Sequence, residues 1–250
     1  MELYHQLKTQ VRKQLKGHFW FLYGWVVLIS ILCFGIQQLA LLCAQPSIQV
    51  ILRLVLSLLC VIINSIMLFI FILRVRDKKF KGADIHYAFS KGGNIMFASL
   101  LISLVNISIQ TTIQILLPIV SLALLCSVFV QFFFVCWYVL LAFMVYDHQV
   151  EIKELCLKPL RMMRHHVKTL LLVGGYYVLW NLLLQIAIQY ILAPELMNRG
   201  VEAILHTQTI ASIPLTTIAF VGVLFYLVQF VILVFLHMYL ANFYEQQRYQ

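Results

Sequence analysis

Long stretches without a charged side chain occupy most of this chain. Counting His as neutral, five of them cover 179 of the 250 residues. A helix that crosses the hydrocarbon core of a bilayer needs about 20 apolar residues, so the longest stretch, 92–146, has room for two crossings, with Pro118 at the turn between them. The stretches are continuously apolar rather than alternating, which favours helices over a transmembrane β-barrel. The pattern predicts six membrane-spanning helices, at 19–42, 54–73, 95–117, 120–146, 169–193 and 213–241.

A short basic segment with one apolar face precedes the first, third and fifth predicted spans. These segments are 2–16, 83–91 and 151–168. In the first of them, apolar residues recur every four positions, at Leu3, Leu7, Val11 and Leu15. That spacing places them on one face of a helix, and helices of this kind lie in the plane of the membrane interface. We therefore expect three interfacial amphipathic helices.

Polar residues repeat along the chain with an offset of 75 positions. The dipeptide Lys16-Gly17 recurs as Lys91-Gly92. Two stripes of amide side chains share that offset and a four-residue spacing, namely Asn106, Gln110 and Gln114 in one span and Asn181, Gln185 and Gln189 in another. We predict one membrane domain of three parallel units, each an interfacial helix followed by two spans, at about 1–75, 76–150 and 151–250. The inverted repeats of many secondary transporters are not indicated.

The composition excludes several classes of protein. The chain has 63% hydrophobic and 11% charged residues, whereas soluble domains have roughly 45–50% and 25%. Its mean hydropathy is +0.94. A soluble globular protein, a disordered chain and a disulfide-rich secreted scaffold are therefore excluded, and the predicted fold class is an all-α polytopic membrane protein.

The basic residues are distributed unequally between the two sides of the membrane. With six spans, 16 of the 18 Lys and Arg residues fall on the side of the termini, and only Arg53 and Arg199 fall on the other. Basic loops stay inside the cell, so we predict a protein of the bacterial cell membrane with both termini in the cytoplasm. Orientation alone explains the net charge of +9, so no nucleic acid partner is expected.

The same basic residues make anionic phospholipids the expected partners of the cytoplasmic side. Each Lys or Arg near an anionic leaflet contributes about 1 kcal/mol of binding free energy. The candidate lipid-binding residues are Lys8, Arg12, Lys13, Lys16, Lys78, Lys79, Lys81, Lys91, Lys158, Arg161, Arg164 and Lys168.

The amide stripes allow two interpretations. They could line a polar groove for a lipid headgroup, a peptide or another polar substrate. They could instead hydrogen-bond to neighbouring helices, at roughly 1 kcal/mol each, and this packing role is the one that we favour.

Catalytic and metal-binding residues are sparse. Asp147, His148 and Glu151 follow the fourth span, and His165 and His166 precede the fifth, but no metalloprotease or nucleophile motif accompanies them. The six Cys residues form no CxxC pair. No Asp, Glu, Lys or Arg lies within a predicted span, which disfavours ion-coupled transport. We predict no catalytic residue, no metal ion and no cofactor.

Short motifs distributed over nearly the full length resemble a known family. They are Leu7-Lys8, Arg12-Lys13 and Leu15-Lys16-Gly17 near the start, Asp147 after the fourth span, then Met163 and Trp180. The chain resembles a family of uncharacterised six-helix bacterial membrane proteins, whose layout is similar to the membrane domain found beside some glycerophosphodiester phosphodiesterases. Pro159 and His165 depart from its pattern, which has Ser and Gly there. The resemblance implies a fold and no established reaction.

Three hypotheses about function follow from these features. The first is a non-enzymatic scaffold or accessory protein that interacts with lipids or a membrane partner. The alternative is a transporter or facilitator of an amphiphilic, lipid-like or peptide substrate. The least favoured is a membrane-embedded lipid enzyme.

Overall fold

The computed structural model describes residues 2–39, 46–78, 80–117, 120–147, 152–187 and 215–248. In this part of the chain all regular structure is helical, so the all-α prediction is confirmed. Six of the helices are long and apolar enough to cross a membrane, as expected for a multi-pass membrane protein. They are α2 (Phe19–Gln38), α3 (Pro46–Val75), α5 (Gly92–Leu116), α6 (Val120–Asp147), α8 (Val167–Ala187) and α10 (Leu215–Gln247).

Three short helices precede α2, α5 and α8 at the positions expected from the sequence. They are α1 (Glu2–Leu15), α4 (Gly82–Ser90) and α7 (Ile152–His165). Side chains fasten the last two to α6: Tyr87 of α4 donates to the carbonyl of Tyr146 at 2.7 Å, and Trp137 donates to the carbonyl of Cys156 of α7 at 3.0 Å. Gly17 turns the chain from α1 into α2 with a φ of +81°, a conformation that glycine adopts without steric cost.

The six long helices pack in a cyclic order. The inner helices α3, α6 and α10 each contact the other two. Each outer helix contacts its hairpin partner and one further inner helix: α2 contacts α3 and α10, α5 contacts α6 and α3, and α8 contacts α10 and α6. Each of the three hairpins thus places its inner helix (α3, α6 or α10) at the centre and its outer helix (α2, α5 or α8) on the outside. Three repeated units would pack in this way, but the sequence repeat itself stays a prediction.

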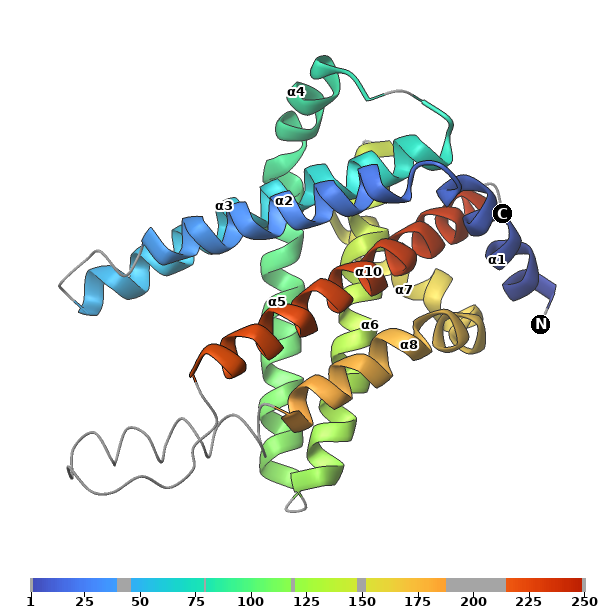
Figure 1. The fold of residues 1–250 in the computed structure, drawn as a ribbon. Helices are drawn as coiled ribbons and strands as arrows, with labels where there is room; N and C mark the ends of the chain where they lie inside the picture. The colour runs from blue at the N-terminus through green and yellow to red at the C-terminus, as the bar shows by residue number, and fades with distance from the viewer. Residues whose placement is uncertain are drawn as a thin grey trace, which may run out of the picture.

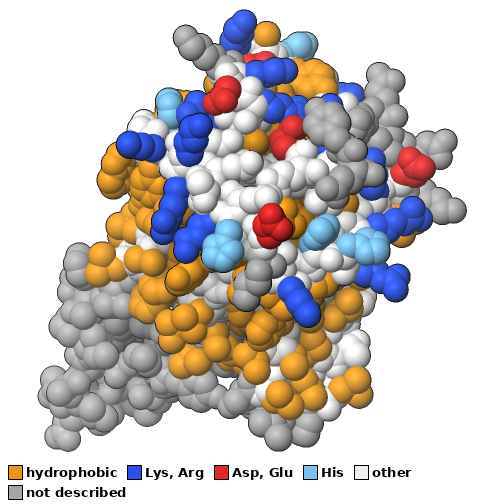
Figure 2. Space-filling view, turned by 90° about the vertical axis from the view of Figure 1, so that its right-hand side faces the viewer, with side chains coloured by type: hydrophobic (Ala, Val, Ile, Leu, Met, Phe, Trp, Pro, Cys, Tyr) orange, Lys and Arg blue, Asp and Glu red, His pale blue; other side chains and the backbone are white. Residues whose placement is uncertain are grey.

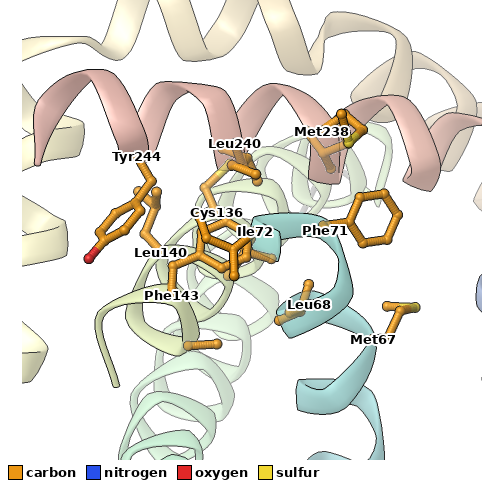
Figure 3. Packing of buried hydrophobic residues seen from close by; sticks show 14 of the residues in the cluster. Met67, Leu68, Phe71, Ile72, Cys136, Leu140, Phe143, Met238, Leu240 and Tyr244 are labelled. Carbon is orange, nitrogen blue, oxygen red and sulfur yellow. The ribbon is translucent and has the colours of Figure 1, made fainter. Parts of the chain in front are cut away.

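The hairpins are close-packed near the chain termini. Figure 1 shows them converging where N and C lie and diverging toward their other ends. In the convergent part, side chains of the three inner helices meet with no more than 2% exposure (Figure 3). They include Phe71, Ile72, Leu140, Phe143, Leu240 and Tyr244. Because lipid tails are as apolar as these side chains, van der Waals packing rather than transfer from water stabilises such a core in a bilayer.

The close-packed end of the bundle also carries most of the described charge. Both termini, α1 and the last turns of α10 lie there (Figure 1), and Lys, Arg and His side chains gather on its surface beside a large apolar area (Figure 2). We call it the basic end. From the middle of α5 toward its other end, Leu104 and Ile115 are 61% and 75% exposed, as expected of side chains that face lipid.

The spanning helices are longer than the uncharged stretches. Helix α3 begins at Pro46 and includes Arg53, while α6 and α10 include Asp147 and Glu245 in their last turns. The predicted spans themselves contain no Asp, Glu, Lys or Arg, but the helices extend beyond them and include charged residues near their ends. A helix continues beyond the hydrocarbon core when its terminal charges reach the interface or find partners, and at the basic end they find partners.

Candidate functional site

An ion-pair cluster joins the three inner helices at the basic end. It consists of Arg76, Asp147, Tyr244, Glu245 and Arg248. Arg76 binds Asp147 in a bidentate manner, with N–O distances of 2.6 and 2.5 Å, and its Nε donates to Glu245 at 2.7 Å. The hydroxyl of Tyr244 donates to Asp147 at 2.8 Å, and Arg248 lies 3.4 Å from the same carboxylate. One arginine thus links the end of α3 to α6 and α10.

The cluster is largely shielded from solvent. The side chain of Asp147 is 4% exposed, and those of Arg76 and Glu245 are 17% and 19% exposed. Burial alone would lower the pKa of Arg76, but its hydrogen bonds to Asp147 and Glu245 outweigh burial and raise that pKa further above its usual range. Two carboxylates around a planar guanidinium form short, charge-assisted hydrogen bonds. We infer that the cluster fixes the ends of the three helices relative to one another.

The sequence carries one signal for this cluster. The chain has only nine acidic residues, and two of them, Asp147 and Glu245, directly follow a tyrosine at the end of an uncharged stretch. By sequence, Asp147 is a candidate catalytic group, and Arg76 is one of the 16 basic residues on the side of the termini. Their pairing spans 71 positions, so it depends on helix packing that the sequence pattern does not reveal.

The candidate catalytic residues have other partners. Asp147 belongs to the ion-pair cluster, whereas Nε2 of His166 lies 3.0 Å from Oε1 of Gln247 and its ring packs against Phe243. His165 is exposed, and His148 and Glu151 lie outside the described residues. Within the described residues, no three His, Cys, Asp or Glu side chains are grouped closely enough to hold a metal ion.

The two amide stripes make separate contacts. Gln110 donates to the carbonyl of Ser127 in α6 at 3.1 Å, while Asn181 donates to Tyr177 of its own helix at 2.8 Å. Asn106 and Gln185 are half-buried, Gln114 is exposed, and Gln189 lies outside the described residues. In the first stripe, Gln110 therefore contributes a hydrogen bond within the α5–α6 hairpin. Among the described residues, no hydrogen bond connects an amide of one stripe to an amide of the other.

Replacing Gln110 with leucine should lower the free energy of unfolding by about 0.6 kcal/mol, and by no more than about 1.7 kcal/mol, as found for hydrogen bonds between membrane helices. The matched control is Gln114→Leu, one turn along the same stripe, whose side chain is exposed and whose loss should have no measurable effect. Unfolding of both variants by SDS in mixed micelles, followed by tryptophan fluorescence, measures the difference. An equal loss in the two variants would contradict a packing role for Gln110.

A groove lies between α8 and α10 beneath α1. Its volume is about 410 Å³, within the range of about 300–1,000 Å³ that is usual for ligand sites. Apolar side chains of α8 and α10 form its walls, and α1 contributes Tyr4, Lys8 and Arg12. A positively charged mouth therefore adjoins an apolar slot.

Helix α1 is held over this groove by both apolar and polar contacts. Leu7 and Val11 are fully buried. Asn242 of α10 donates to Oε1 of Gln14 at 2.7 Å, and Gln246 donates to Gln10 at 3.0 Å. The mouth of the groove is thus built by a docked helix rather than by a loop.

The predicted lipid-binding residues are spread over the basic end. Lys8 and Arg12 line the groove. Lys91 is half-buried, with its Nζ 5.8 Å from the centre of the Tyr87 ring, and Lys79 lies outside the described residues. The remaining residues are exposed: Lys13, Lys16, Lys78, Lys81, Lys158, Arg161, Arg164 and Lys168.

Comparison with known proteins identifies no relative of this chain. No described protein family, curated protein or solved structure matches the chain. The resemblance to the six-helix bacterial family therefore stays a prediction, and inferences about function depend on the geometry alone.

Proposed function

We propose that this integral membrane protein is a non-enzymatic scaffold or accessory protein of the cell membrane. Its basic end would face the cytoplasm and bind anionic lipids and a membrane protein partner. The observation that supports this most is the ion-pair cluster, in which the carboxylates of Asp147 and Glu245 bind Arg76. Side chains committed to fixing helix ends suit a rigid platform better than a catalytic centre.

The same cluster gives the transport alternative less support. A transporter that alternates between two open sides must separate its helices at each end in turn. Here one buried guanidinium links α3, α6 and α10 at the basic end, and its removal from both carboxylates would leave uncompensated charges. The described amides that would line a substrate path make separate contacts instead.

The exposed basic residues of α7 are suited to hold the basic end against an anionic leaflet. Lys158, Arg161 and Arg164 are exposed on one short helix, and each contributes about 1 kcal/mol near an anionic surface. This attraction would orient the platform relative to the membrane.

Site-specific photocrosslinking in living cells tests the scaffold function. A photoreactive amino acid is placed at Lys78 or Lys81 of the basic end, with Leu104 and Ile107 of α5 as lipid-facing controls. We expect both basic-end positions to crosslink to the same protein and the two controls to crosslink to lipid. Adducts with lipid alone at all four positions would contradict a scaffold function.

A further inference from the structure

We propose that the groove beneath α1 binds one anionic phospholipid, with its phosphate between Lys8 and Arg12 and an acyl chain in the slot between α8 and α10. This proposal goes beyond the scaffold function, which needs no individual bound lipid.

The walls of the groove match an acyl chain. Helix α8 contributes Leu172, Leu179 and Leu183, and α10 contributes Ile232 and Phe235. From Leu172 to Leu183 the slot follows α8 for about 16 Å, at about 1.5 Å per residue. Leu179 is 55% exposed, so the slot is open along its side, and a chain can enter from the surrounding bilayer.

The mouth of the groove matches a phosphate. Tyr4, Lys8 and Arg12 follow one another at four-residue spacing, so they share a face of α1. Nζ of Lys8 lies 5.9 Å from the centre of the Tyr4 ring, and Arg12 lines the same groove, together with Tyr239 of α10. Among the described residues, neither Lys8 nor Arg12 forms an ion pair with a carboxylate.

Charge complementarity therefore identifies the class of ligand. Two cations without an acidic partner attract an anion, and Arg is suited to bidentate binding of phosphate. An apolar slot directly beside them selects an anion that carries a hydrocarbon chain. Because α1 is docked by Leu7, Val11 and the pair Asn242–Gln14, the site is largely preformed and needs little ordering upon binding.

Native mass spectrometry of the full-length protein in a mild nonionic detergent tests the proposal. Dioleoyl phosphatidylglycerol is titrated against dioleoyl phosphatidylcholine, which has the same chains and no net charge. We expect the wild type to retain one phosphatidylglycerol and K8Q/R12Q to bind it about tenfold more weakly or worse, a change equivalent to about 1.4 kcal/mol. The matched control K13Q/K16Q removes the same charge from two exposed positions, one in the last turn of α1 and one directly after it, and should bind as the wild type does.

A second pair of variants tests the slot independently of charge. L179W places an indole in the groove and should reduce binding of phosphatidylglycerol, whereas L28W, on the exposed surface of α2, should not. Inorganic phosphate at millimolar concentration should not displace the lipid; displacement would identify a free anion as the ligand. The proposal would be overturned if K8Q/R12Q and K13Q/K16Q lost the same affinity for phosphatidylglycerol, or if the wild type retained phosphatidylglycerol and phosphatidylcholine equally. Neither result would affect the crosslinking test of the scaffold function.

Discussion

Replacing Asp147 with asparagine should lower the free energy of unfolding by about 3 kcal/mol. Removing one partner of a buried ion pair costs about 3–5 kcal/mol, because the remaining charge stays buried without compensation. The lower value is expected because Glu245 continues to neutralise Arg76. Asparagine keeps the size of the side chain, so the change tests charge and not volume. Unfolding by SDS in mixed micelles measures the effect.

Asp77→Asn is the matched control for this change. Asp77 pairs with Arg74 at 3.9 Å, and its side chain is 83% exposed. Exposed pairs of this kind contribute about 0–1 kcal/mol, so the control should unfold almost as the wild type does. Equal stability of the Asp147 and Asp77 variants would show that the cluster does not hold the helices together.

Replacing Gly174 with alanine should destabilise the fold by about 1–3 kcal/mol, the usual cost of overpacking a close-packed core. A Cβ atom on Gly174 would lie 2.0 Å from two ring carbons of Phe132, which is itself fully buried. Because Phe132 is fully buried, its ring cannot turn out into solvent, and we expect α8 to move away from α6. A small residue at this position lets the two helices approach closely.

The next residue supplies the control. A Cβ atom on Gly175 would meet nothing within 4 Å, and alanine favours a helix interior by up to about 1 kcal/mol over glycine. Gly175→Ala should therefore be neutral or stabilising. Comparison of the two variants in the same unfolding assay isolates the contact with Phe132. Destabilisation of both by the same amount would contradict close packing of α8 on α6 at this point.

The spanning helices were predictable because a bilayer imposes a simple requirement on sequence. Each span needs a long apolar stretch, and each such stretch yielded a helix in the described chain. The ends were less predictable, since a charged residue extends a helix when another helix supplies its partner. Asp147 could be recognised as unusual from the sequence, but Arg76 could not be identified as its partner, because their contact depends on how α3 and α6 pack.

The groove, too, could be predicted from the sequence only in part. Lys8 and Arg12 were predicted to bind anionic lipid because their charge and spacing are local properties of α1. The slot beside them, lined by Leu179 and Phe235, forms because α8 packs beside α10 and α1 docks on both helices. These three helices lie far apart in the sequence. The local sequence pattern therefore predicted the residues that would bind the lipid headgroup. The slot that would hold the acyl chain depends on tertiary packing.

We expect the basic end to be one fixed platform. Distance measurement by pulsed electron paramagnetic resonance tests this most directly. Spin labels are attached to cysteines that replace Lys78, beside α3, and Arg164 of α7, after the natural cysteines are replaced by alanine. In proteoliposomes we expect a single narrow distance distribution that broadens when Asp147 is replaced by asparagine. Two well-separated distances in the protein with Asp147 intact would show that the basic end opens and closes, and would contradict a fixed platform.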